Sequence, residues 1–274
     1  MASPSPYPAS TAMDIWRRGF RAMFRRELHT WRWRKFLTSA IAWLVVLILV
    51  ALVLGGNVGV TTSRNGGAPT VRNLSQGFFF QAWLFFPMLA AIFSTLGAIS
   101  DERRQGTLPW VLSKPLPRSA FYLAKLSANL LVKAMTIILM PGLLAAIILA
   151  SRGVAVNPVG LFGAMKLVGV VLAFYVTLTL MMDAIGINRT ATLIIPSLLL
   201  LVSPVLPQLA LLFRMPVLGS VLTQVTPMGI TSTVLSNWVT AGQAPDNFLP
   251  IICTVLWAVG FTLVGVTALK RQEI

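Results

Sequence analysis

Charged residues inside or beside long apolar stretches are the first candidates for chemistry in this sequence. Lys133, Lys166 and Asp183 are the three that stand out. A charge at membrane depth is costly, and one that is kept there often serves a function. Lys133 and Asp183 fall near the predicted ends of apolar stretches, where we expect a side chain to reach the membrane surface. Lys166 lies deeper, and it is interpreted either as a cavity residue or as a helix–helix contact.

Patterns of catalytic or ligand-binding residues are missing from the sequence. There are no paired carboxylates, no nucleophile elbow of the Gly-x-Ser-x-Gly type and no Gly-x-x-x-x-Gly-Lys-Ser/Thr phosphate loop. His29 is the single histidine and Cys253 the single cysteine, so a His/Cys metal site or a disulfide framework is not expected. We therefore predict that the chain is not an enzyme, holds no cofactor or metal and does not itself bind ATP through such a loop.

The composition is that of an integral membrane protein. Hydrophobic residues make up 56% of the chain and charged residues 11%, with a mean hydropathy of +0.81. Soluble domains carry roughly 25% charged residues. The formal net charge is +15, but the basic residues flank apolar stretches, so they are better explained by membrane orientation than by a nucleic-acid partner.

The elements that must position the candidate residues are membrane-spanning helices, each of which needs about 20 apolar residues. We predict an all-α fold with six such spans. Small residues at four-residue spacing in the fourth span, Gly169, Ala173 and Thr177, predict close helix packing there. The spans are expected at residues 36–60, 78–100, 116–151, 156–182, 190–213 and 247–269.

Lys and Arg are distributed unevenly between the predicted loops. With the N-terminus inside, sixteen of them face the cytoplasm, four face outward and two lie within spans. Because basic residues concentrate on the cytoplasmic side, we expect both termini in the cytoplasm and the protein in the plasma (inner) membrane.

The segments outside the spans have distinct compositions. Residues 1–12 are rich in Pro and Ser and are expected to be a disordered tail. Residues 13–35 place aromatic residues at helical spacing among arginines, which predicts an amphipathic helix in the membrane interface, with a simple positive-inside anchor as the alternative. Residues 214–246 lack charge from 215 to 245 but contain Pro and Gly breaks, which predicts short helices dipping in from the outer face or an ordinary extracellular loop.

The stretch 101–119 is the one long charged interruption inside the apolar sequence, and it falls on the cytoplasmic side. Glu102 marks the end of the second span, where it can pair with Arg118 or with a basic residue of the N-terminal helix. Gly106 breaks the helix, Thr107 can cap a new one and Pro115 ends it. Leu108, Val111 and Leu112 would share one face of this short helix, which indicates a docking element for a partner protein.

This stretch resembles the motif of the ABC type-2 permease family, the membrane subunits of type V ABC exporters. The family pattern is an acidic–basic pair, Gly-Thr-Leu, a Leu-Ser-x-Pro turn, an Arg and a Lys about seven residues later. It matches residues 102–108 and 112–115, then Arg118 and Lys125, between the second and third of six predicted helices.

The resemblance implies a dimer of permeases, usually two identical copies, each paired with a separate ATPase subunit that holds ATP and Mg. Residues 102–114 would form a coupling helix seated in a groove of the ATPase, and residues 13–35 would form the connecting helix beside it. The residues implied in coupling are Glu102, Arg103, Gly106, Thr107, Leu108, Val111, Leu112, Pro115 and Arg118.

The implied function is export of a substrate along a path between the two permease copies. Two alternatives stay open: transmission of motion to an extracytoplasmic partner by the same fold, and a membrane scaffold without transport. The substrate is not identified, and lipid, drug, peptide and glycolipid are all compatible. The path would be lined by residues of spans two and five, namely Phe85, Phe86, Met88, Leu198 and Leu201.

Overall fold

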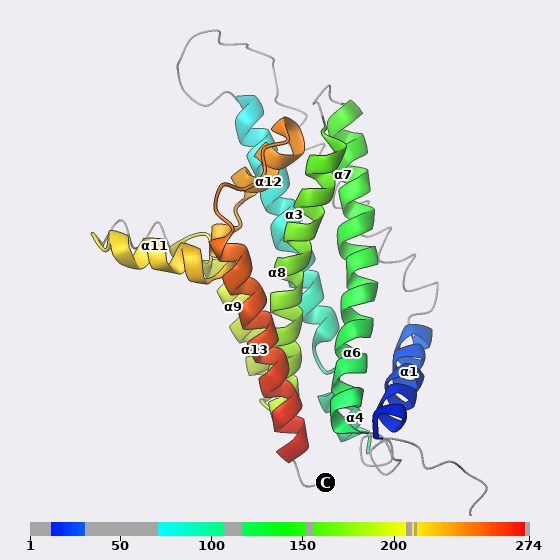
Figure 1. The fold of residues 1–274 in the computed structure, drawn as a ribbon. Coiled ribbons are helices and arrows are strands. Elements are labelled where there is room, and N and C mark those ends of the chain that lie inside the picture. The colour runs from blue at the N-terminus through cyan, green and yellow to red at the C-terminus, as the bar shows by residue number, and fades with distance from the viewer. Residues whose placement is uncertain are drawn as a thin grey trace, which may run out of the picture.

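The computed structural model describes residues 12–30, 71–106, 117–151, 156–206, 210 and 213–271. Within these residues the chain forms helices and turns and no strand, which confirms the all-α prediction. Long helices lie side by side in a bundle, with α1 and α4 near one end and α12 near the other (Figure 1). The predicted tail, apart from its last residue, and the first predicted span, 36–60, lie outside the described residues.

Four helical segments are long and apolar enough to cross a membrane, and they match the predicted spans two, three, four and six. The first contains α3 (Val71–Thr95) and α4 (Ser100–Arg104). The second joins α6 (Arg118–Lys133), a π-helical segment η1 (Ala134–Leu139) and α7 (Met140–Ser151). The third and fourth are α8 (Pro158–Ile185) and α13 (Leu249–Arg271). The spanning segments are Phe80–Arg104, Arg118–Ser151, Pro158–Ile185 and Leu249–Arg271.

The fifth predicted span is shorter than expected. Helix α9 (Arg189–Val202) has 14 residues, whereas the sequence predicts one span over 190–213. The helix gives way to a turn over 203–205. Pro204 has no backbone N–H and cannot continue the hydrogen-bond ladder of the helix, which is a physical reason for the end at this place.

Helix α8 is the centre of the bundle and packs against α3, α6, α9, α12 and α13. Its ends are well defined by sequence. The Asn157 side chain accepts hydrogen bonds from the backbone N–H groups of Val159 and Gly160, and Pro158 occupies the first turn. Gly186, with φ of 90°, ends the helix in the left-handed conformation. Both ends of the central helix are therefore capped by local contacts.

The π-helical segment interrupts the longest spanning segment directly after Lys133. Pro141 follows it by two residues and cannot donate a backbone hydrogen bond to the preceding turn. A missing donor of this kind favours a local widening of the helix.

The segment before the last span forms short helices, as predicted. They are α11 (Pro216–Val225), a 3-10 turn η2 (Pro227–Gly229) and α12 (Ser232–Ala241). Helix α12 packs on α8 and α3, and α11 projects sideways from the bundle (Figure 1). The indole N–H of Trp257 donates to the carbonyl oxygen of Val225 over 2.9 Å, which ties the end of α11 to α13.

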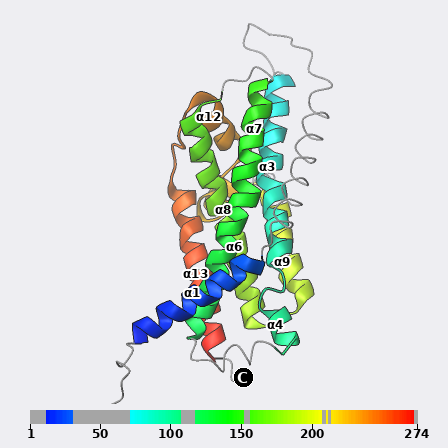
Figure 2. The same ribbon diagram turned by 90° about the vertical axis from the view of Figure 1, so that its right-hand side faces the viewer.

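The amphipathic N-terminal helix is present as α1 (Ala12–Thr30). Trp16, Phe20 and Phe24 stack along one face, and Met23 is buried. The helix crosses α6 obliquely (Figure 2), and the Trp16 indole donates to the Ser119 hydroxyl. Residues 31–35 of the predicted helix lie outside the described residues, and its position in the membrane interface stays a prediction.

Candidate functional site

The candidate site is built around the short helix α4, at the same end of the bundle as α1. Gly97 separates α4 from α3 because it adopts a φ of 83°, which an L-residue with a side chain rarely accepts. A Cβ atom at this position would also collide with the Asp101 carboxylate. The chain therefore bends between α3 and α4, and this bend sets the direction of α4.

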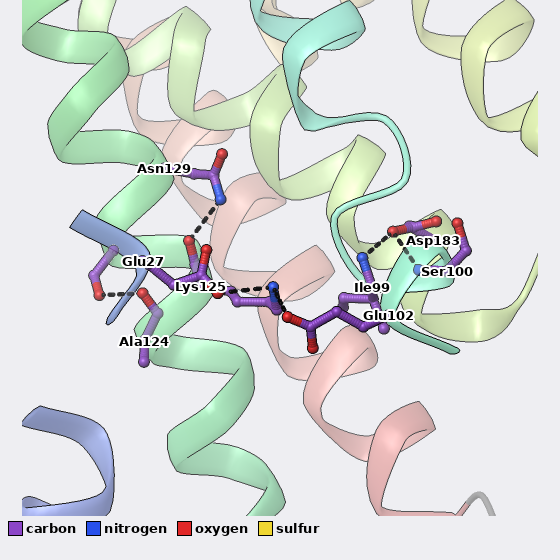
Figure 3. A network of polar contacts seen from close by, with 9 residues as sticks. Glu27, Ile99, Ser100, Glu102, Ala124, Lys125, Asn129 and Asp183 are labelled. Atoms are coloured by element: carbon purple, nitrogen blue, oxygen red, sulfur yellow. Dashed lines mark hydrogen bonds and ion pairs between the residues drawn. The ribbon is translucent and has the colours of Figure 1, made fainter. Parts of the chain in front are cut away.

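Asp183 fastens the beginning of α4 to the end of α8. Its Oδ2 accepts hydrogen bonds from the backbone N–H groups of Ile99, at 2.6 Å, and Ser100, at 3.1 Å (Figure 3). The first N–H groups of a helix have no partner within the helix, and a carboxylate at this end is favourable. The expectation that Asp183 reaches the membrane surface is wrong, since the residue is only 2% exposed.

Lys125 of α6 joins α4 to α1. Its Nζ lies 3.0 Å from Oε1 of Glu102 and 2.9 Å from Oε1 of Glu27, so one ammonium serves two carboxylates (Figure 3). The Lys125 side chain is 4% exposed, and those of Glu27 and Glu102 are 18% and 15% exposed. Shielding from water makes such contacts stronger than surface ion pairs. The three residues therefore hold α1, α4 and α6 together.

The structure gives Glu102 a partner that the sequence did not predict. The expected partners are Arg118 or a basic residue of the N-terminal helix, but the ion pair that the structure shows is with Lys125. The N-terminal helix contributes a carboxylate, Glu27, to the same cluster. Arg118 donates to the backbone carbonyls of Leu269 and Lys270 and thus ties the start of α6 to the end of α13.

Further contacts of α4 reach the end of α8 and the start of α9. The Arg103 guanidinium donates to the carbonyl oxygen of Ala184 at 3.3 Å. Asp101 pairs with Arg189 at 3.4 Å, with both side chains well exposed. Three consecutive residues of α4 thus contact α6, the end of α8 and the start of α9, so a shift of α4 would act on several helices at once.

A second polar cluster lies deeper, around Lys133. This side chain is fully buried, and its Nζ donates to Thr95 Oγ1 at 2.8 Å and to Asn129 Oδ1 at 2.6 Å. The Asn129 amide in turn donates to the carbonyl oxygen of Lys125. The expectation that Lys133 reaches the surface is therefore wrong. It connects the last residue of α3 to α6, two helical turns from Lys125.

The predicted docking loop is only partly described. Gly106 has a φ of 68° and ends the helical region at the predicted break. Thr107, Leu108, Val111, Leu112 and Pro115 lie outside the described residues, so the short helix stays a prediction.

The predicted path residues differ in exposure. Phe86, Leu198 and Leu201 are 41%, 55% and 59% exposed, and Phe85 is partly buried. Met88 is fully buried in the bundle and contributes no exposed surface. The reason is helical geometry, because residues two apart, such as Phe86 and Met88, point to nearly opposite sides of a helix.

Two features of the site were not predicted from the sequence: the contact of Glu27 with Lys125, and the burial of Lys133 and Asp183. Glu27 had a signal, since it is one of only two acidic residues among the many arginines of residues 13–35.

Within the described residues, no group of three or more His, Cys, Asp or Glu side chains is arranged to hold a metal ion.

Comparison with known proteins supports one family. A family model described as "ABC-2 family transporter protein" matches residues 32–274. No curated protein matches the chain. The match covers all of the helices described above except α1.

Proposed function

Because the chain belongs to the ABC-2 transporter family, we propose that it is the permease subunit of an ABC exporter, driven by ATP hydrolysis in a separate ATPase subunit. Multi-pass membrane character is supported by the four apolar helices. The family's membrane components are generally not catalytic. ATP and Mg²⁺ accordingly belong to the partner subunit in this proposal.

The single observation that carries the proposal is the set of contacts made by α4. This helix ends at Arg104, and the turn at Gln105 and Gly106 leads into the predicted docking loop. The helix is bonded to α6 through Glu102 and to α8 through Asp183. A soluble motor that binds the loop would displace α4, and rigid contacts would pass the displacement to the bundle. An element of this kind is what coupling requires.

The proposed complex contains two copies of this chain, with the substrate path between them. The exposed apolar residues Phe86, Leu198 and Leu201 are candidates for this surface. In this proposal the protein spans a cell membrane and both termini face the cytoplasm, because the basic residues concentrate on the cytoplasmic side.

Co-purification tests the partner. A tagged chain expressed together with a candidate ATPase subunit from the same genome should retain that subunit after extraction. Leu108→Asp combined with Leu112→Asp should release it, because two charges would be placed on the apolar face of the docking helix. Leu218→Asp combined with Val221→Asp, on exposed positions of α11, is the matched control. If both double variants retain the subunit equally, the docking assignment is wrong.

A further inference from the structure

A groove between α6, α8 and α13 is not used by the proposed coupling site. It has a volume of about 420 Å³. Gly169 and Ala173 of α8 form part of its lining, with Leu130 of α6 and Val259 of α13 at its sides. The sequence predicts close helix packing at these small residues, whereas in the structure they leave space. Among the described residues, the groove is therefore a gap between three spanning helices.

The chemistry of the groove is apolar with one charged group. Two threonines line it, but the Thr177 hydroxyl donates to the carbonyl of Ala173 and the Thr262 hydroxyl to that of Ala258, so both are satisfied within their own helices. Lys166 is the charged lining residue. Its side chain is exposed, and it forms no ion pair with the described part of the chain. The groove thus presents one ammonium group beside an apolar lining.

The groove runs along α8 from within one leaflet to a point past the middle of the bilayer. Lys166 and Thr177 are separated by about 16 Å along α8, at 1.5 Å per residue. The hydrocarbon core is about 30 Å thick, so one leaflet contributes about 15 Å. Lys166 lies about 12 Å from the start of α8, a helix about 42 Å long that exceeds the core by a few ångströms at each end. The ammonium can thus reach the headgroup level by extending its side chain.

From these observations we propose that the groove binds an anionic phospholipid of the surrounding bilayer. The acyl chain fills the apolar channel along Ala173, and the phosphate contacts the Lys166 ammonium. The lipid belongs to the leaflet at the end of the bundle where α12 lies, because Lys166 is in that half of α8. This site is distinct from α4, and the proposal does not depend on export. A lipid without net charge would fill the same channel but would bind less tightly, because its attraction to the Lys166 ammonium is weaker.

Native mass spectrometry of the full-length chain tests the proposal. The protein is purified in mild detergent, depleted of lipid and titrated with phosphatidylglycerol or phosphatidylcholine carrying identical acyl chains. We expect about a fivefold preference for phosphatidylglycerol, since one basic residue near the membrane surface favours an anionic lipid to this extent. Lys166→Gln should abolish the preference. Lys270→Gln, which removes the same charge at an exposed position outside the groove, should keep it.

Larger side chains that fill the groove distinguish a lipid bound inside it from a lipid that only contacts the protein surface. Ala173→Phe should reduce the binding of both lipids while Lys166 is still present. Leu263→Trp, at an exposed position of the groove edge, provides a second test if the first variant does not assemble. Equal binding of the two lipids by the unmodified chain would overturn the proposal. So would a preference that persists in Lys166→Gln, or lipid binding that survives both groove-filling changes.

Discussion

Lys125 and Glu102 form an ion pair of 3.0 Å in which the two side chains are only 4% and 15% exposed. The neighbouring residue on the same short helix, Asp101, pairs with Arg189 over 3.4 Å, but with side chains 41% and 49% exposed. Two adjacent acidic residues of α4 thus make ion pairs of very different burial. The buried pair joins α4 to α6, and the exposed one joins α4 to α9. This difference provides an internal control for the importance of the first contact.

Neutralising the two acidic residues should therefore have unequal effects on stability. Glu102→Gln should cost about 2–4 kcal/mol, because Lys125 would lose part of its compensation in a shielded position. Asp101→Asn should cost less than about 1 kcal/mol, because exposed pairs contribute little. Thermal unfolding of both variants in the same detergent measures the difference, and equal losses would contradict the assignment of Glu102 as the stronger contact.

Asp183→Asn should loosen the beginning of α4. The amide can accept only through one oxygen and without charge, so the hydrogen bonds from Ile99 and Ser100 weaken by about 1–3 kcal/mol in total. Hydrogen exchange of residues 97–104 should become faster. Asp246→Asn, at an exposed position, is the matched control and should leave this segment unchanged. Unaltered exchange in Asp183→Asn would show that the cap is not needed.

Gly97→Ala should destabilise the bend between α3 and α4. Positive φ costs an L-residue roughly 1–2 kcal/mol, and the new Cβ would also collide with the Asp101 carboxylate. Gly260→Ala on α13 is the contrasting change, because a Cβ there meets no atom within 4 Å and the residue lies inside a helix. It should raise stability by up to about 1 kcal/mol. Shifts of the same sign in melting temperature would argue against the strained bend.

Removing a hydrogen-bond partner of Lys133 should lower the stability of the protein more than replacing Lys133 itself. Asn129→Leu removes an acceptor and leaves a buried cation with less compensation, which is expected to cost about 3–5 kcal/mol. Lys133→Met keeps most of the volume and removes the charge, so it should cost clearly less. The order of the two melting temperatures is the measurement, and the reverse order would exclude a compensated buried charge.

The long helices could be predicted because each is a continuous apolar stretch. The end of α9 at Val202 is a limit of that reasoning, since an uncharged run with several prolines does not reveal where the helix stops. Gly106 was predictable as a break, because glycine readily takes the left-handed conformation found there.

The contacts of the site were less predictable than its location. Asp183 and Ile99 are 84 residues apart in sequence, and Lys125 and Glu27 are 98 residues apart. Spacing along one helix says nothing about such partners. A charge near the end of a span looks the same in sequence whether it faces water or is buried by a neighbouring helix, which is why Lys133 and Asp183 were expected at the surface.

We propose that motion of the ATPase reaches the far end of the bundle through α4. Hydrogen exchange of residues 222–239, in the complex with its ATPase subunit, tests it most directly. In the unmodified complex and in Asp101→Asn, trapping ATP should make this segment exchange faster than in the nucleotide-free state. In Glu102→Gln the difference should disappear while the ATPase subunit stays bound. An undiminished ATP-dependent change in Glu102→Gln would contradict coupling through the Glu102–Lys125 contact.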